Sequence, residues 1–143
     1  MTEYSPNACL ALGRIADEIS AGDPSGHELL VELGYRVAGI PRGWQAWAVL
    51  ATGGRSRIRG HGFRAELFDG TGGQARHFAG VARAVTLLGD RATLWISAKV
   101  RRDAEESPDG ELTRLAVDFA TALLDGSLPP RESGDWIREH LCV

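Results

Sequence analysis

Ionisable side chains gather most densely between Phe68 and Gly80, in the stretch FDGTGGQARHFAG. Asp69 precedes a glycine-rich turn, and His77 follows that turn within a few residues. A carboxylate that orients an imidazole makes a general base. Glu66, just upstream, could replace Asp69 in that pair, and the two carboxylates together could do glycosidase-type acid/base work. The candidate catalytic residues are therefore His77, Asp69 and Glu66.

Further polar residues near this stretch could hold a substrate: His61, Arg64, Gln74 and Arg76. Arginine pairs bind phosphate or carboxylate groups, and a helix N-terminus presents unpaired N–H groups that favour anions. This arrangement predicts a small helical enzyme, a hydrolase or transferase acting on an anionic or sugar substrate, centred on residues 69–77. No nucleophile stands out, because no Ser–His–Asp arrangement is visible.

The same stretch also has a structural interpretation, which its residue types favour. Thr71 and Gln74 have the spacing of a capping box, and Asp69 begins a turn. His77 adjoins Phe78, so it borders a buried stripe. Because no complete catalytic signature is present, the alternative function is a non-catalytic protein–protein interaction module, such as a regulator, an adaptor or an immunity-type protein.

Residues 70–75 match the dinucleotide fingerprint G-x-G-x-x-A, and Asp90 follows twenty positions after Gly70. The preceding segment carries Arg64 and Glu66 where a buried parallel strand would be apolar. Asp90 also comes before the next candidate strand instead of closing it. We therefore expect no nucleotide cofactor.

A metal site is not expected either. The spacings H-x-x-x-H and C-x-x-C, which are typical of metal ligands, do not occur. The residues that could serve are His27, His61, His77, His140, Cys9 and Cys142.

The elements that must position these residues are helices. Apolar residues recur at helical intervals in six segments, which makes a single domain over residues 1–143 with short loops the expected architecture. The fold class is all-α, a compact bundle of about six helices. A short strand pair is an alternative around residues 63–68 and 92–98. The helical segments are 7–22, 25–39, 43–54, 74–88, 107–126 and 133–141.

Two local features decide how these helices begin and what they bury. Ser25 with Glu28 forms a capping box, and Ser133 is expected to cap the last helix. The pair Trp44 and Trp47 is expected to face the core; if exposed, it becomes a contact patch for a partner or a membrane. The Gly- and Arg-rich stretch from Arg55 to Arg64 is expected to be an exposed loop that could reach an acidic partner.

The composition of the chain limits which partners and which cellular location are expected. Hydrophobic residues make up 43% of the chain and charged residues 24%, which is ordinary for a globular domain. The net charge of −3 argues against nucleic acid as a partner. No apolar run approaches the ~20 residues of a membrane span, and the N-terminal stretch lacks signal-peptide features. The sequence thus predicts a cytoplasmic protein in which Cys9 and Cys142 are buried free thiols; a bridge between them is the alternative.

Overall fold

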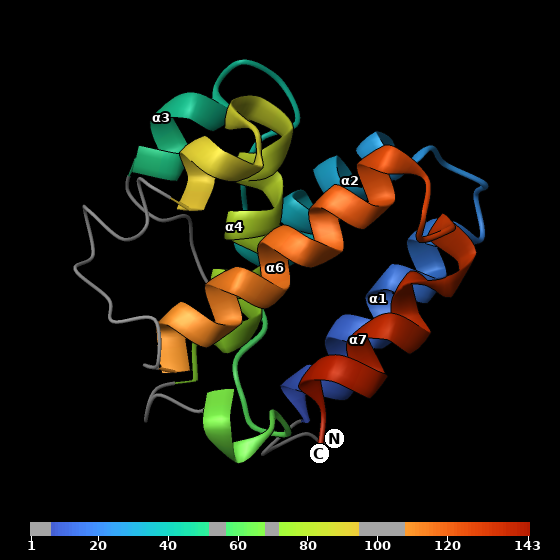
Figure 1. Cartoon of the computed structure of the whole chain (residues 1–143), viewed down its shortest axis with the longest axis vertical. Helices are drawn as coiled ribbons and strands as arrows, with labels where there is room; N and C mark the ends of the chain where they lie inside the picture. Colours follow the sequence, from blue (N-terminus) through green and yellow to red (C-terminus); the bar gives the residue numbers. More distant parts are fainter. Residues whose placement is uncertain (1–6, 52–56, 68–71, 95–107) are drawn as a thin grey trace.

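The computed structural model describes residues 7–51, 57–67, 72–94 and 108–143, which form a bundle of helices (Figure 1). The predicted all-α class is confirmed. No helix in these ranges combines the length and the apolar character that crossing a bilayer requires. Residues 90–94 are helical as well. The elements are α1 (Ala8–Ser20), α2 (Gly26–Ala38), α3 (Ala46–Ala51), the 3-10 turn η1 (Ala65–Leu67), α4 (Gln74–Leu88), α6 (Pro108–Asp125), the 3-10 turn η2 (Pro130–Glu132) and α7 (Ser133–Leu141).

The alternative of a strand pair is wrong where the structure describes it. Phe63 makes one isolated antiparallel bridge with Cys142, residues 65–67 form a 3-10 turn, and residues 92–94 are helical. Residues 68 and 95–98 lie outside the described ranges. A strand requires apolar and polar residues to alternate, and this alternation is weak in both segments, so neither is expected to prefer a strand over helical structure.

The capping prediction for α2 is confirmed. The Ser25 Oγ accepts a hydrogen bond from the Glu28 N–H at 3.1 Å, and the Glu28 Oε1 accepts one from the Ser25 N–H at 2.9 Å. At the other end, Gly39 adopts a left-handed conformation with φ of 67°, and its N–H donates to the helix. Glycine adopts this conformation at no steric cost, so α2 ends there.

The capping prediction at Ser133 is wrong. Glu132 is the N-cap of α7, and Ser133 is its first residue, with a buried Oγ that has no hydrogen-bond partner within the described part of the chain. The N-cap of α4 is Gly73. The predicted capping box of Thr71 with Gln74 depends on Thr71, which lies outside the described residues.

The core lies between α2, α4 and α6, and α4 packs against both of the others. Figure 1 shows α6 lying across α4 and α2. Aromatic rings continue the core toward α7, because Phe119 lies 5.1 Å from Phe78 and 5.0 Å from Trp136, measured between ring centroids. The largest fully buried aliphatic side chains of the core include Leu12, Leu29, Leu30, Leu33, Ile40, Leu67, Leu112, Ile137 and Leu141.

The first and last helices, α1 and α7, run antiparallel, so the start of α1 and the end of α7 lie at the same end of the bundle (Figure 1). Their close approach depends on Gly134, where a Cβ would lie 2.0 Å from the Asp17 Oδ1. Arg138 of α7 joins the two helices by binding Asp17 of α1 at 3.0 Å, and it also binds Asp135 of its own helix at 2.7 Å. The start of α1 and the end of α7 are therefore held side by side.

A disulfide between Cys9 and Cys142 joins this pair of helices, with a Cα–Cα distance of 5.6 Å. The extended residues 61–64 pass beside it: the Cys9 N–H donates to the His61 carbonyl at 3.3 Å. The Val143 N–H donates to the Gly62 carbonyl at 2.9 Å. We call this arrangement the terminal junction.

The expectation of free thiols is therefore wrong, and the alternative of a bridge is found. The physical reason is the antiparallel packing of α1 and α7, which brings Cys9 and Cys142 within the separation that a disulfide spans. Sequence spacing carries no information on this, because 133 positions separate the two residues.

Candidate functional site

His77, the central residue of the predicted catalytic group, is almost fully buried, with 7% of its surface exposed. Its Nε2 lies 2.7 Å from the Thr113 Oγ1 of α6, so the ring joins α4 to α6. A buried imidazole needs such a partner to offset its desolvation. The position of His77 at the edge of the core agrees with the structural interpretation of this stretch.

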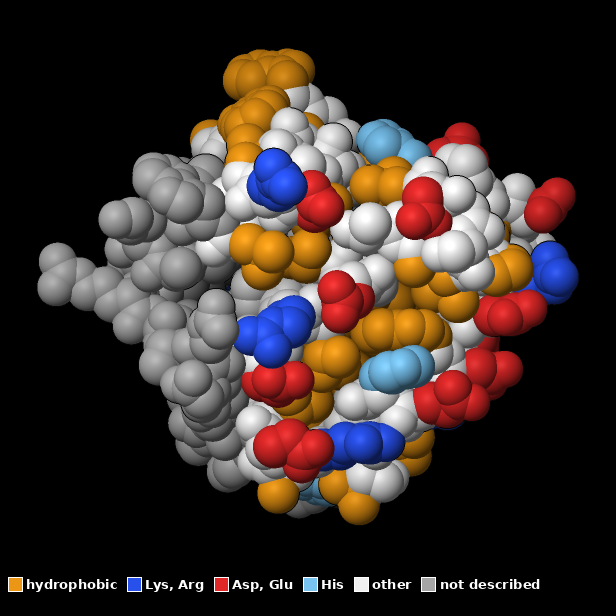
Figure 2. Space-filling model, viewed as in Figure 1, with side chains coloured by type: hydrophobic (Ala, Val, Ile, Leu, Met, Phe, Trp, Pro, Cys, Tyr) orange, Lys and Arg blue, Asp and Glu red, His pale blue; other side chains and the backbone are white. Residues whose placement is uncertain are grey.

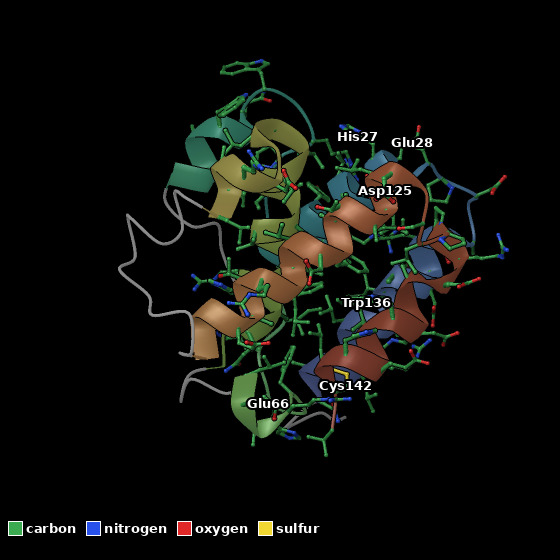
Figure 3. The ribbon with its side chains drawn as sticks, in the orientation of Figure 1. His27, Glu28, Glu66, Asp125, Trp136 and Cys142 are labelled. Carbon is green, nitrogen blue, oxygen red and sulfur yellow. A yellow bond between two sulfur atoms is a disulfide. The ribbon has the colours of Figure 1, made fainter. Side chains whose placement is uncertain are left out.

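Of the two predicted carboxylates, the structure describes only Glu66. Glu66 lies exposed on η1, at the end of the bundle near Cys142 (Figure 3). Asp69 lies outside the described residues. The catalytic assignment of His77, Asp69 and Glu66 therefore stays a prediction.

The predicted substrate-binding residues divide between two places. His61 and Arg64 belong to the terminal junction, where the Arg64 side chain donates to the carbonyls of Cys142 and Glu139. Gln74, 1% exposed, and the half-buried Arg76 lie in the first turn of α4. Arg64 thus has a structural task in holding the end of α7, which the sequence did not indicate.

The described ranges do not contain the strand that a dinucleotide site requires before its glycines. A dinucleotide site needs a strand before the glycines, but residues 65–67 form a 3-10 turn, and Asp90 begins a helical segment. The described residues also contain no group of three or more His, Cys, Asp or Glu side chains that could hold a metal ion.

The clearest departure from expectation concerns the tryptophans before and within α3. Trp44 is 78% exposed and Trp47 is 52% exposed, so the prediction that they face the core is wrong. Ala46 is buried in their place. Figure 2 shows hydrophobic side chains projecting from the molecule in the region of α3. Two large aromatic side chains in contact with water on one turn make this segment a candidate contact surface.

The tryptophans stand on a tight turn that places them outside the bundle. Pro41, Arg42 and Gly43 follow the end of α2, and the Gly43 carbonyl accepts a hydrogen bond from the Ala46 N–H at 3.0 Å. The Trp44 carbonyl accepts one from the Trp47 N–H at 3.2 Å. This turn therefore directs Ala46 inward and leaves both indole rings outside.

Arginines surround an aromatic ring next to this turn. The Arg42 guanidinium lies 4.0 Å from the centroid of the Tyr35 ring, and that of Arg57 lies 5.3 Å from it. Glu32 binds Arg42 through both carboxylate oxygens. Arg42 and Trp44 are two positions apart, so their Cα atoms lie within about 7 Å. We call Tyr35, Arg42, Trp44, Trp47 and Arg57 the tryptophan–arginine surface.

A buried arginine supports the turn from below. Arg83 of α4 is 3% exposed, and its guanidinium donates to the Arg42 carbonyl at 3.2 Å and to the Thr86 Oγ1 at 2.6 Å. Burial lowers the pKa of Arg83. No carboxylate pairs with it within the described ranges. A buried cation used to bind backbone carbonyls fixes the position of this turn on the bundle.

Sequence reasoning missed this surface although a signal was present. Pro41 and Gly43 directly precede Trp44, and both residue types favour an exposed turn at that position. The exposed arginine loop, by contrast, is confirmed for Arg57, Arg59 and Arg64, whereas Arg55 lies outside the described residues.

Comparison with known proteins gives no relative from which to transfer a role. No protein-family model matches the chain, and no curated protein or solved structure matches it either. The physical properties of the exposed residues are therefore the basis for a functional assignment.

Proposed function

We propose that this protein is a non-catalytic interaction module that binds a protein partner through the tryptophan–arginine surface. The observation that carries the proposal is the exposure of Trp44 and Trp47, 78% and 52%. Tryptophan, tyrosine and arginine are the residue types most enriched at the centres of protein interfaces. This surface combines all three on one turn and the adjoining helix end.

The two rings offer enough apolar surface to matter energetically. At roughly 200 Å² per tryptophan, covering the exposed parts of Trp44 and Trp47 removes about 260 Å² from water. At about 25 cal/mol per Å², this burial favours binding by about 6–7 kcal/mol before the costs of association. The support from Arg83 lowers those costs, because a turn already held in place loses little freedom on binding.

The catalytic hypothesis has less support. A general base must reach the proton that it removes, and the His77 ring is 7% exposed and lies 2.7 Å from the hydroxyl of Thr113. Hydrolysis or transfer at residues 69–77 remains a prediction, for which a loss of activity in His77→Ala without a loss of stability would be the supporting result.

A cytoplasmic location likewise stays a prediction. The Cys9–Cys142 disulfide favours an oxidising compartment, because structural disulfides are rare where cellular thiols are kept reduced. The interaction proposal holds for either location, since the tryptophan–arginine surface and the disulfide lie on different elements.

Site-specific photocrosslinking in the native host would test the proposal. Benzoylphenylalanine replaces Trp47 in one protein and Leu10 in the control, because Leu10 is an exposed apolar residue of α1 with 46% exposure. A protein crosslinked from position 47 but not from position 10 is then purified, and its affinity is measured by calorimetry against the wild type and against Trp44→Ala.

The expected result is a loss of affinity of at least about 30-fold in Trp44→Ala, the ~2 kcal/mol that defines an interface hot spot. The Leu10→Ala variant is expected to bind as the wild type does. The proposal is wrong if position 47 captures no more than position 10, or if the captured protein binds Trp44→Ala as tightly as the wild type.

A further inference from the structure

The charge around Tyr35 is unbalanced, which indicates the chemistry of the partner. Arg42 and Arg57 both place their guanidinium groups over the ring of Tyr35. Glu32 neutralises Arg42, but no carboxylate pairs with Arg57 within the described part of the chain. Glu32 also lies 3.8 Å from the Nε of Arg36, so this one carboxylate serves Arg36 and Arg42 and leaves Arg57 without a carboxylate in the described residues.

The two guanidinium groups lie near each other. Since both contact one ring, they are separated by no more than about 10 Å, slightly more than the Debye length of ~8 Å at physiological salt. Arg83 adds a third cation beneath the turn, with its guanidinium on the Arg42 carbonyl. A negative group arriving from outside would be attracted to these cations, and Arg57 is exposed to receive it.

Arg42 is already held in a geometry suited to a carboxylate. Its Nε and Nη2 donate to the two oxygens of Glu32, the bidentate arrangement in which arginine binds carboxylates best. The side chains of Arg42 and Glu32 are 55% and 28% exposed, so a partner can reach the guanidinium. Exposed pairs of this kind contribute little stability and exchange readily.

We propose, on the basis of the interaction function above, that the partner presents an acidic protein segment whose carboxylates bind Arg57 and take Arg42 from Glu32. Its apolar side chains then cover Trp44 and Trp47. An acidic protein segment fits better than an anionic membrane, because a carboxylate of the partner can take over the bidentate pair that Arg42 already makes with Glu32.

A selection from a random peptide library displayed on phage tests this and does not require that the natural partner be identified first. The full-length wild-type protein is the target, and the double variant Trp44→Ala/Trp47→Ala is used for counter-selection. The peptides that remain need the tryptophans, and we expect them to be enriched in Asp and Glu relative to the unselected library. One enriched peptide is then synthesised, and its affinity is measured by fluorescence anisotropy at rising salt concentration.

Three charge variants separate the roles of the groups. Arg42→Gln is expected to weaken binding of the acidic peptide about tenfold, the loss of a charge-assisted hydrogen bond. Glu32→Gln is expected to strengthen it by about two- to fivefold, because the competing carboxylate is gone. Arg131→Gln is the matched control: this side chain is 78% exposed and belongs to η2, and its removal should leave the affinity unchanged.

The outcomes distinguish this inference from the function on which it rests. Enrichment of neutral or basic peptides, or weaker binding in Glu32→Gln, overturns the acidic partner and leaves the interaction surface intact. A library without any tryptophan-dependent peptide counts against both. Tryptophan-dependent sedimentation with phosphatidylserine vesicles would identify a membrane as the occupant, and tryptophan-dependent self-association in analytical ultracentrifugation would identify a second copy; either result overturns the proposal.

Discussion

Reducing the Cys9–Cys142 disulfide should lower the stability of the protein more than the loss of any exposed ion pair. The bridge closes a loop across 133 positions of sequence, nearly the whole chain. The chain-entropy relation gives about 5 kcal/mol at 25 °C for a loop of this length. Because domains of this size are commonly stable by only about 5–15 kcal/mol, the bridge supplies a large share.

The folded state should change little when the disulfide is reduced. After reduction, the terminal junction still contains its backbone hydrogen bonds, including those from Cys9 to His61 and from Val143 to Gly62. Arg138 also continues to hold α7 on α1 through Asp17. We therefore expect the reduced protein to stay folded in the absence of denaturant, with the loss of stability arising mainly from a freer unfolded chain.

Urea unfolding followed by tryptophan fluorescence measures this effect, with and without a thiol reductant. The midpoint should fall on reduction, and the slope m should rise, because an uncrosslinked unfolded chain exposes more surface. The double variant Cys9→Ser/Cys142→Ser is the control: it should unfold as the reduced protein does and should not respond to the reductant. Equal midpoints for the oxidised and the reduced protein would refute the reasoning, since a bridge that spans almost the whole chain must restrict its unfolded state.

Further predictions concern packing, a buried hydrogen bond and one ion pair. Gly134→Ala places a Cβ against α1 and should cost about 2 kcal/mol or more, about 4–8 °C in Tm, whereas Gly22→Ala, with no close neighbour except its own helix, should cost far less. Thr113→Val removes the hydroxyl that bonds buried His77 and should cost about 1–2 kcal/mol in urea unfolding; an unchanged midpoint would mean that the bond contributes nothing. The hydrogen bond from Arg42 holds the pKa of Glu32 below the ordinary 4.5, so the stability that this pair contributes is present above pH 4.5 and is lost as the pH falls through the lowered pKa. NMR titration of the Glu32 side-chain carboxyl carbon measures this pKa, and a midpoint at or above 4.5 would contradict the prediction.

The helices were predictable because their signals are local. Ser25 and Glu28 lie three positions apart, and the apolar stripes of α2 and α4 repeat within a few turns, so each can be recognised in a short window. The capping prediction at Ser133 failed because the preceding turn η2 runs directly into α7 and places the cap one residue earlier. A capping pattern shows that a helix begins nearby, whereas the exact residue depends on the backbone before it.

The terminal junction was not predictable in this way, because every contact in it joins distant parts of the sequence. Arg64 was a candidate for binding a substrate, since an arginine near a glycine-rich turn suits an anion. In the fold it donates to the carbonyls of Cys142 and Glu139, more than 70 positions away. The pairing of residues 61–64 with the end of α7, through the bridge from Phe63 to Cys142 and the hydrogen bond from the Arg64 N–H to the Leu141 carbonyl, brings these groups together.

The error at Trp44 and Trp47 is informative about function for a physical reason. Hydrophobicity alone predicts burial of the two rings, but only the small side chain of Ala46 reaches the core from this turn. Exposing two indole rings instead gives up several kcal/mol of folding free energy that a buried arrangement would supply. The described structure also supports the exposed turn with Arg83, a buried cation whose desolvation is unfavourable in its own right. The partner proposed above would account for the exposed rings, because a rigid turn that presents them loses little freedom when they are covered.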